Sequence, residues 1–126
     1  MGEVRGDFVL SNPANGQSIE LNALVDSGAV VSIIGKDVAE AIGLKADSKA
    51  VVYLADDSTT EMDQVDVVAF QFKDRTTGNP VLISEYGVEP LIGQMVLEGL
   101  DLLVDCPRNK VIVRPSSPAY PSYKAK

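Results

Sequence analysis

The apolar residues of this 126-residue chain are grouped in short runs, and residues that favour turns separate one run from the next. In Ser18–Val25, the apolar side chains from Ile19 to Ala23 occupy alternate positions, which is typical of a strand with one buried face. The preceding Asn15-Gly16 pair favours a tight hairpin turn. Since no run has the length of a long helix, the pattern predicts a mainly β fold with short helices.

The remaining elements follow from the same patterns. Helical spacing of apolar residues, with an acid in the first turn and Gly43 as a stop, predicts a helix at Lys36–Ile42, and a second helix is expected at Gln94–Leu100. The stretch Lys73–Pro80 contains Thr-Gly-Asn-Pro and is interpreted as a turn. The expected strands are Phe8–Leu10, Ser18–Val25, Ala29–Ile34, Ala50–Leu54, Glu61–Phe72, Val81–Ser84, Leu102–Val104 and Val111–Val113.

A chain of this length is expected to form one domain. We place that domain at residues 1–114. Residues 115–126 are rich in proline and serine, which predicts a C-terminal tail that is either disordered or extended.

The composition excludes several classes of function. The chain has no histidine, which rules out Ser–His–Asp and Cys–His catalysis and the common zinc sites within this chain. Its net charge of −7 and the lack of a Lys/Arg cluster argue against a nucleic-acid partner. Carboxylate chemistry, hydroxyl chemistry and binding remain, and we expect neither a metal nor a cofactor.

The first residues lack the long apolar core of a signal peptide. No apolar run approaches the ~20 residues that span a bilayer. A cytoplasmic location is therefore the default expectation. A processing domain cut from a polyprotein or from a membrane-anchored chain is kept as an alternative.

The tetrapeptide Asp26-Ser27-Gly28-Ala29 lies between two apolar stretches. Burying an aspartate there costs free energy unless the fold supplies hydrogen bonds, which suggests a use for the side chain. Gly28 permits a tight turn that aims amide groups at the carboxylate. Asp-Ser-Gly is also an ordinary turn sequence, so a plain turn is the alternative at this point.

The chain resembles the retropepsin-like aspartic peptidases, whose signature is an apolar strand entering Asp-Ser/Thr-Gly-Ala, then a hairpin flap, then an apolar-apolar-Gly loop entering a helix. Here the first and last parts are Ala23–Ala29 and Leu91-Ile92-Gly93, with the hairpin Ala50–Phe72 between them. The resemblance covers Phe8 to Val113. It implies a mainly β retropepsin-like fold, with a closed, barrel-like lobe, a flap and two short helices.

The resemblance also implies a mechanism. Members of the family use two carboxylates that share one proton and activate a water molecule. Because this chain has one such motif, Asp26 would meet Asp26 of a second copy, so a homodimer that cleaves peptide or protein substrates is implied. Ser27 would hydrogen-bond across the dyad, and the Gly28 backbone would help to grip an extended substrate. We expect activity to favour acidic to mildly acidic pH.

Some positions differ from those of the viral members. The acid and the arginine that brace viral dimers are replaced by Val30 and Gln94, and the hairpin end is Asp56-Asp57-Ser58 instead of glycine-rich. A catalytically inactive retropepsin-fold module for binding or dimerisation is therefore the alternative function.

Several other residues have a predicted environment. Tyr53 either lines a substrate groove or packs on its strand. Asp56 and Asp57 are expected at a solvated hairpin tip, not in a calcium loop. Cys106 is expected to be a partly buried structural thiol, and Asp101 is expected to face solvent together with Asp105.

Overall fold

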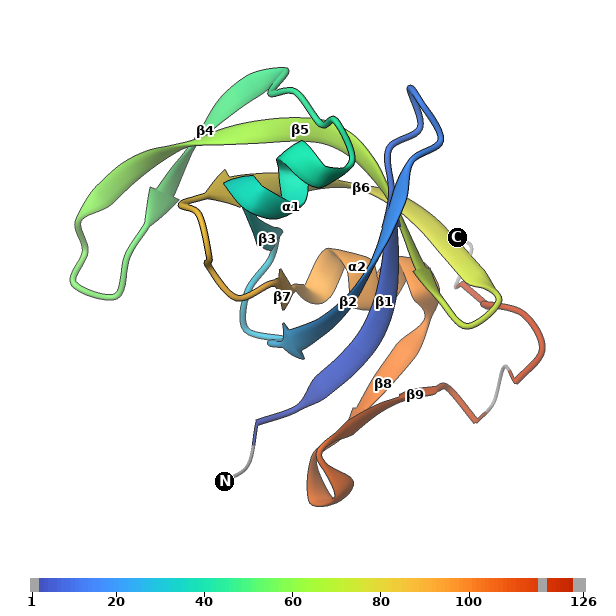
Figure 1. The fold of residues 1–126 in the computed structure, drawn as a ribbon. Helices are drawn as coiled ribbons and strands as arrows, with labels where there is room; N and C mark the ends of the chain where they lie inside the picture. The colour runs from blue at the N-terminus through green and yellow to red at the C-terminus, as the bar shows by residue number, and fades with distance from the viewer. Residues whose placement is uncertain (1–2, 116–117, 124–126) are drawn as a thin grey trace.

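The computed structural model describes residues 3–115 and 118–123 (Figure 1). These residues form a mainly β structure with two short helices, as predicted. Along the chain the elements are β1 (Arg5–Ser11), β2 (Ser18–Val25), β3 (Ser32–Gly35), α1 (Lys36–Ala41), β4 (Ser48–Tyr53), β5 (Thr59–Phe72), β6 (Arg75–Ser84), β7 (Leu91–Ile92), α2 (Gln94–Leu100), β8 (Leu102–Asp105), a 3-10 turn (Cys106–Arg108) and β9 (Lys110–Val113).

The strands form one sheet in the order β4-β5-β6-β3-β7-β2-β1-β9-β8, and β1 also pairs with β5. This extra pairing, which includes Leu10 opposite Phe70, joins β5, β6, β3, β7, β2 and β1 in a continuous ring. The core contains Phe8, Leu10 and Phe70, all at most 1% exposed, together with side chains from α2 such as Leu100. The hairpin of β4 and β5 extends away from this body (Figure 1).

The predicted strand at Ala29–Ile34 is wrong in its first half, because β3 begins only at Ser32. The carbonyl oxygens of Ala29 and Val30 accept hydrogen bonds from amides at the start of α2 and not from a neighbouring strand. Val30 is 65% exposed, so its apolar character did not indicate burial. Residues 29–31 therefore belong to the loop that follows β2.

The predicted turn at Lys73–Pro80 is also wrong. Only Lys73 and Asp74 form the turn, and β6 continues from Arg75 with Thr77 opposite Phe70. Pro80 is tolerated inside the strand because it lies opposite the register shift between Val65 and Val68, where a ladder hydrogen bond is not required.

Two side chains lie in environments opposite to those expected. Cys106 is exposed in the 3-10 turn between β8 and β9, so the partly buried thiol was a wrong prediction. Asp101 is buried, with 4% of its surface exposed, although its alternation with apolar residues suggested a solvent-facing position. Asp105 is half-buried and pairs with Arg108.

The described part of the tail, residue 115 and residues 118–123, has no helix or strand, and Ser122 lies against Asp101. The predictions for residues 116–117 and 124–126 lie outside the described residues. None of the helices in the described part of the chain combines the length and the apolar character needed to cross a membrane.

A tyrosine after β6 contacts the first helix. The hydroxyl group of Tyr86 donates a hydrogen bond to the carboxylate of Glu40 on α1, with oxygen–oxygen distances of 2.6 and 2.8 Å. This hydrogen bond stabilises the protonated phenol and raises the pKa of Tyr86 above its ordinary value. The favourable contribution to folding is therefore present below the ordinary pKa of tyrosine and is lost as pH rises through the raised value.

Replacing Glu40 with Gln is expected to lower the pKa of Tyr86 towards ~10, the ordinary value for tyrosine. Ultraviolet titration of the tyrosinate absorbance measures this change, with Tyr86→Phe identifying the signal. Glu85→Gln removes a neighbouring exposed acid and serves as the control. An unchanged titration in Glu40→Gln would show that the hydrogen bond does not hold the proton.

Candidate active site

Asp26 lies immediately after β2, at the start of a tight turn, and its side chain is exposed. The Gly28 amide donates a hydrogen bond to Asp26 Oδ1 at 2.8 Å, and the Ala29 amide donates to the Asp26 carbonyl at 3.1 Å. A Cβ atom at Gly28 would lie only 3.1 Å from the same Oδ1 atom. The turn thus brings its own backbone against one carboxylate oxygen, and glycine leaves room for this approach.

Strand β7 holds the turn from one side. Its residues Leu91 and Ile92 pair in parallel with Leu24 and Val25, the last two residues of β2. The Asp26 amide donates to the Ile92 carbonyl at 3.0 Å, which continues this ladder. The structure therefore brings the two apolar-glycine segments of the sequence together, although they are far apart along the chain.

Helix α2 holds the loop from a second side. The amides of Gln94 and Met95 donate to the carbonyls of Ala29 and Val30 at 2.7 and 3.1 Å. The first amides of a helix have no partner within the helix, so these contacts satisfy them. Gly93, just before α2, is packed so closely that a Cβ atom there would lie 2.8 Å from the Ala29 carbonyl oxygen.

Sequence reasoning missed Ser32. This side chain is 1% exposed, and its hydroxyl group accepts a hydrogen bond from the Gly93 amide at 2.9 Å. A hydroxyl group within the apolar run from Val31 to Ile34 was the available signal, because a buried polar group requires a partner. Ser32 connects β3 to the glycine that precedes α2.

A groove of about 510 Å³ separates the loop from the first strand of the long hairpin. It brings together three of the predicted residues, namely Gly28, Ala29 and Tyr53. Tyr53 is 79% exposed, so packing on its strand is not its main environment. Most of the lining is apolar: Gly28, Ala29, Val30, Val31, Ile33, Ala50, Val51, Val52, Tyr53, Gln64 and Leu82.

The closed end of the hairpin does not line this groove in the described structure, and Figure 1 shows it away from the loop after β2. Asp57 has a positive φ of 67°, and Asp56 Oδ1 accepts hydrogen bonds from the amide and the hydroxyl group of Ser58. These hydrogen bonds lower the pKa of the Asp56 carboxyl group. The tip is an exposed acidic turn, as predicted.

Ser27 is exposed beside Asp26, and its side chain makes no hydrogen bond to any other described residue. Its predicted contact across a dyad stays a prediction. Within the described residues, no group of three or more His, Cys, Asp or Glu side chains is arranged to hold a metal ion.

Residues 13–96 match a family model described as aspartyl protease. The fold is similar to a crystal structure of the retroviral protease-like domain of Ddi1 from Leishmania major, with a TM-score of 0.62 and 18% sequence identity, covering 90% of this chain and 85% of that chain. No curated protein sequence gives a significant match. The predicted retropepsin-like fold is thus confirmed, and the chain belongs to the aspartyl protease family.

Proposed function

We propose that this protein is an aspartic endopeptidase that acts as a homodimer, with Asp26 from each copy forming the catalytic pair. The observation that supports the proposal best is the position of Asp26. Its carboxylate is exposed at a turn that β7 and α2 hold in place, beside a groove lined by apolar residues. A fixed carboxylate that remains accessible can meet both a substrate and a second carboxylate.

In the proposed reaction, the two Asp26 carboxylates share one proton because two close negative charges cannot both form at low cost. The ionised carboxylate accepts a proton from water as the water attacks the peptide carbonyl. The protonated one donates to the carbonyl oxygen, and a proton then passes to the leaving nitrogen. The reaction needs the shared proton, so activity is expected to fall at high pH, where no proton is left to donate to the carbonyl oxygen.

The substrate is proposed to be an extended peptide that lies in the groove. Strand β4 is an edge of the sheet, so its free backbone groups can pair with such a peptide. Val51 and Tyr53 on β4 and Val30 on the loop would contact apolar side chains of the peptide. Gly28 would pair with its backbone from the opposite side, and Ser27 would link the two active-site loops.

Analytical ultracentrifugation combined with titration of a pepstatin-type inhibitor tests the proposal. We expect a dimer and one inhibitor site per two chains, since each site needs two Asp26 carboxylates. A strict monomer that does not bind the inhibitor would contradict the proposal and favour the inactive binding module. Gln94 is the reason to keep that alternative. It occupies the position of the arginine that braces viral dimers, and its side-chain amide donates to Glu98 of its own helix at 3.1 Å.

Replacing Gly93 with Ala is expected to lower kcat/KM by about 10²-fold, the cost of displacing a catalytic group by about 1 Å. The added Cβ atom would meet the backbone oxygens of Ala29 and Val31 at 2.8 and 2.9 Å, so the loop that carries Asp26 must shift. Peptide hydrolysis measures the change. The control is Gly78→Ala, whose Cβ atom would meet only a methyl group of Val67. Equal activity in both variants would contradict the role given to this packing.

A further inference from the structure

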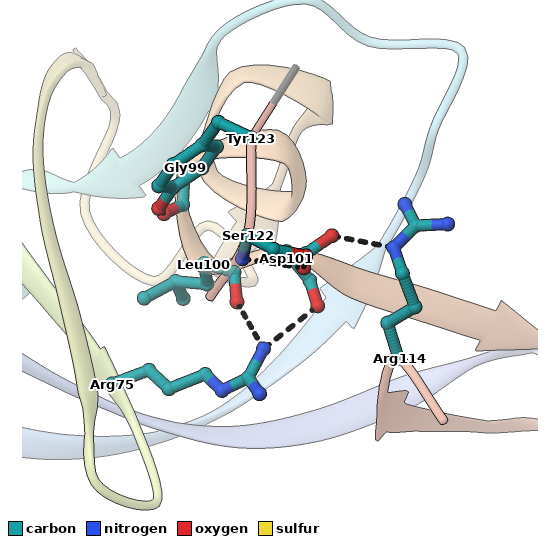
Figure 2. Close-up of polar contacts among 7 residues, drawn as sticks. All are labelled: Arg75, Gly99, Leu100, Asp101, Arg114, Ser122 and Tyr123. Carbon is teal, nitrogen blue, oxygen red and sulfur yellow. Dashed lines mark hydrogen bonds and ion pairs between the residues drawn. The ribbon is translucent and has the colours of Figure 1, made fainter. Parts of the chain in front are cut away.

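Asp101 is a buried acid that the proposed mechanism does not use. It follows the last residue of α2 and has a left-handed conformation, with φ 55°. Its Oδ1 atom accepts a hydrogen bond from Arg114 Nε at 2.5 Å, and its Oδ2 atom accepts from the amide and the hydroxyl group of Ser122 at 3.0 and 3.3 Å. Figure 2 shows Arg114 and the C-terminal arm (residues 118–123) meeting at this carboxylate.

The arm also contacts the last turn of α2. The hydroxyl group of Tyr123 donates a hydrogen bond to the carbonyl oxygen of Gly99. The final carbonyl groups of a helix have no partner within it, so each requires a donor from elsewhere. The Asp101 amide donates to the carbonyls of Leu97 and Glu98. Arg75 Nη1 donates to the carbonyl of Leu100 at 3.0 Å (Figure 2). Among the last four carbonyls of α2, the one at Gly99 therefore receives its hydrogen bond from the arm.

Helix α2 connects this end of the molecule to the active-site loop. It has only seven residues, which is too short to be stable by its own hydrogen bonds. One end donates to Ala29 and Val30 in the loop after Asp26, and the other end is held by β6, the end of β9 and the arm. Because this short helix depends on the contacts at both of its ends, loss of contacts at one end is expected to weaken the hydrogen bonds at the other.

We propose that the C-terminal arm is a strap that positions the Asp26 loop through α2, with Asp101 and Tyr123 as its positioning residues. The arm is suited to this role because its two tyrosines are largely exposed: Tyr123 is 65% exposed and Tyr120 is 80% exposed. Such a segment can detach without global unfolding. Detachment leaves the Gly99 carbonyl and one Asp101 oxygen without the donors that the arm supplies, and the loop loses order.

Amide hydrogen exchange tests the strap in the free protein, so this test does not depend on peptidase activity. Tyr123→Phe removes the hydroxyl donor, and a chain ending at Arg114 removes the arm. We expect the amides of Gln94 and Met95 to exchange about two- to tenfold faster in Tyr123→Phe, the size of one lost hydrogen bond, and faster still without the arm. Tyr120→Phe, which removes a hydroxyl group without a partner among the described residues, should leave them unchanged.

Faster exchange confined to residues 97–101, with Gln94 and Met95 unchanged, would overturn the proposal, and so would an equal acceleration throughout the core strands. If the shortened chain does not fold, Tyr123→Phe decides alone. The catalytic consequence rests on the proposed function: in an active enzyme, Tyr123→Phe should lower kcat by a larger factor than it raises KM, because the loop carries Asp26 but forms only one side of the groove, and the β4 side is untouched. An inactive wild-type chain would refute the proposed function and leave the exchange test valid.

Discussion

Replacing Asp26 with Asn should abolish peptidase activity while the protein keeps its fold. Asparagine has nearly the same shape, and its side-chain oxygen can still accept the hydrogen bond from the Gly28 amide. It cannot accept the proton of the attacking water, however, and in a homodimer the substitution removes both members of the pair. Loss of general acid–base catalysis costs about 10²–10⁴-fold for one group, so we expect at least this reduction in kcat/KM.

Hydrolysis of a fluorogenic peptide library measures the loss, and circular dichroism confirms the fold. Asp74→Asn is the matched control, because Asp74 is an exposed acid in the turn between β5 and β6, outside the groove. It should keep full activity. Wild-type turnover by Asp26→Asn would eliminate the proposed mechanism, whereas activity lost equally in Asp74→Asn would point to an effect of net charge.

Local patterns were sufficient to predict the elements that carry the candidate site. Alternating apolar residues marked β2, and the glycines of Asp-Ser-Gly and Leu91-Ile92-Gly93 marked the ends of two segments that pair in the structure. The hairpin between them was predicted with its tip at the correct residues because strand-forming runs flank a short polar stretch. In each case the prediction rests either on a pattern within one element or on two motifs that occur together in a known family.

Features that depend on distant partners could not be predicted. The Thr-Gly-Asn-Pro stretch resembles a turn, but pairing with β5 and a register shift opposite Pro80 keep it in a strand. The burial of Asp101 depends on Arg114 and Ser122, which approach it only after β9 and the arm have folded back. No pattern of neighbouring residues records these contacts. The sequence around Asp101 therefore indicated the wrong environment.

The same difference between local contacts and contacts of long sequence separation bears on how the chain folds. The hairpins β1–β2, β4–β5 and β8–β9 join neighbouring parts of the chain, so their loops close at low entropic cost. The Asp26 loop is complete only when β7 has entered between β2 and β3 and α2 has docked. The candidate site thus depends on contacts of long sequence separation, and changes that weaken the docking of α2 affect it most.

Arg75 provides the strongest test of how α2 is docked. Its side chain is buried, with 2% of the residue exposed, and its Nη1 atom donates hydrogen bonds to the carbonyls of Leu100 and Asp101, both at 3.0 Å (Figure 2). A guanidinium group at this position also complements the negative end of the helix dipole. Methionine has a similar length and an apolar stem but no donor.

We expect Arg75→Met to lower the free energy of unfolding by about 2–5 kcal/mol, because a buried acceptor that loses its donor costs about 1–3 kcal/mol and two carbonyls are affected. Two buried carbonyls, those of Leu100 and Asp101, lose their charged donor. Urea unfolding followed by circular dichroism measures the change. The control is Arg108→Met, which breaks an ion pair whose arginine side chain is 73% exposed and should cost less than about 1 kcal/mol. An equally small effect of Arg75→Met would mean that β6 and the arm hold α2 without the buried guanidinium.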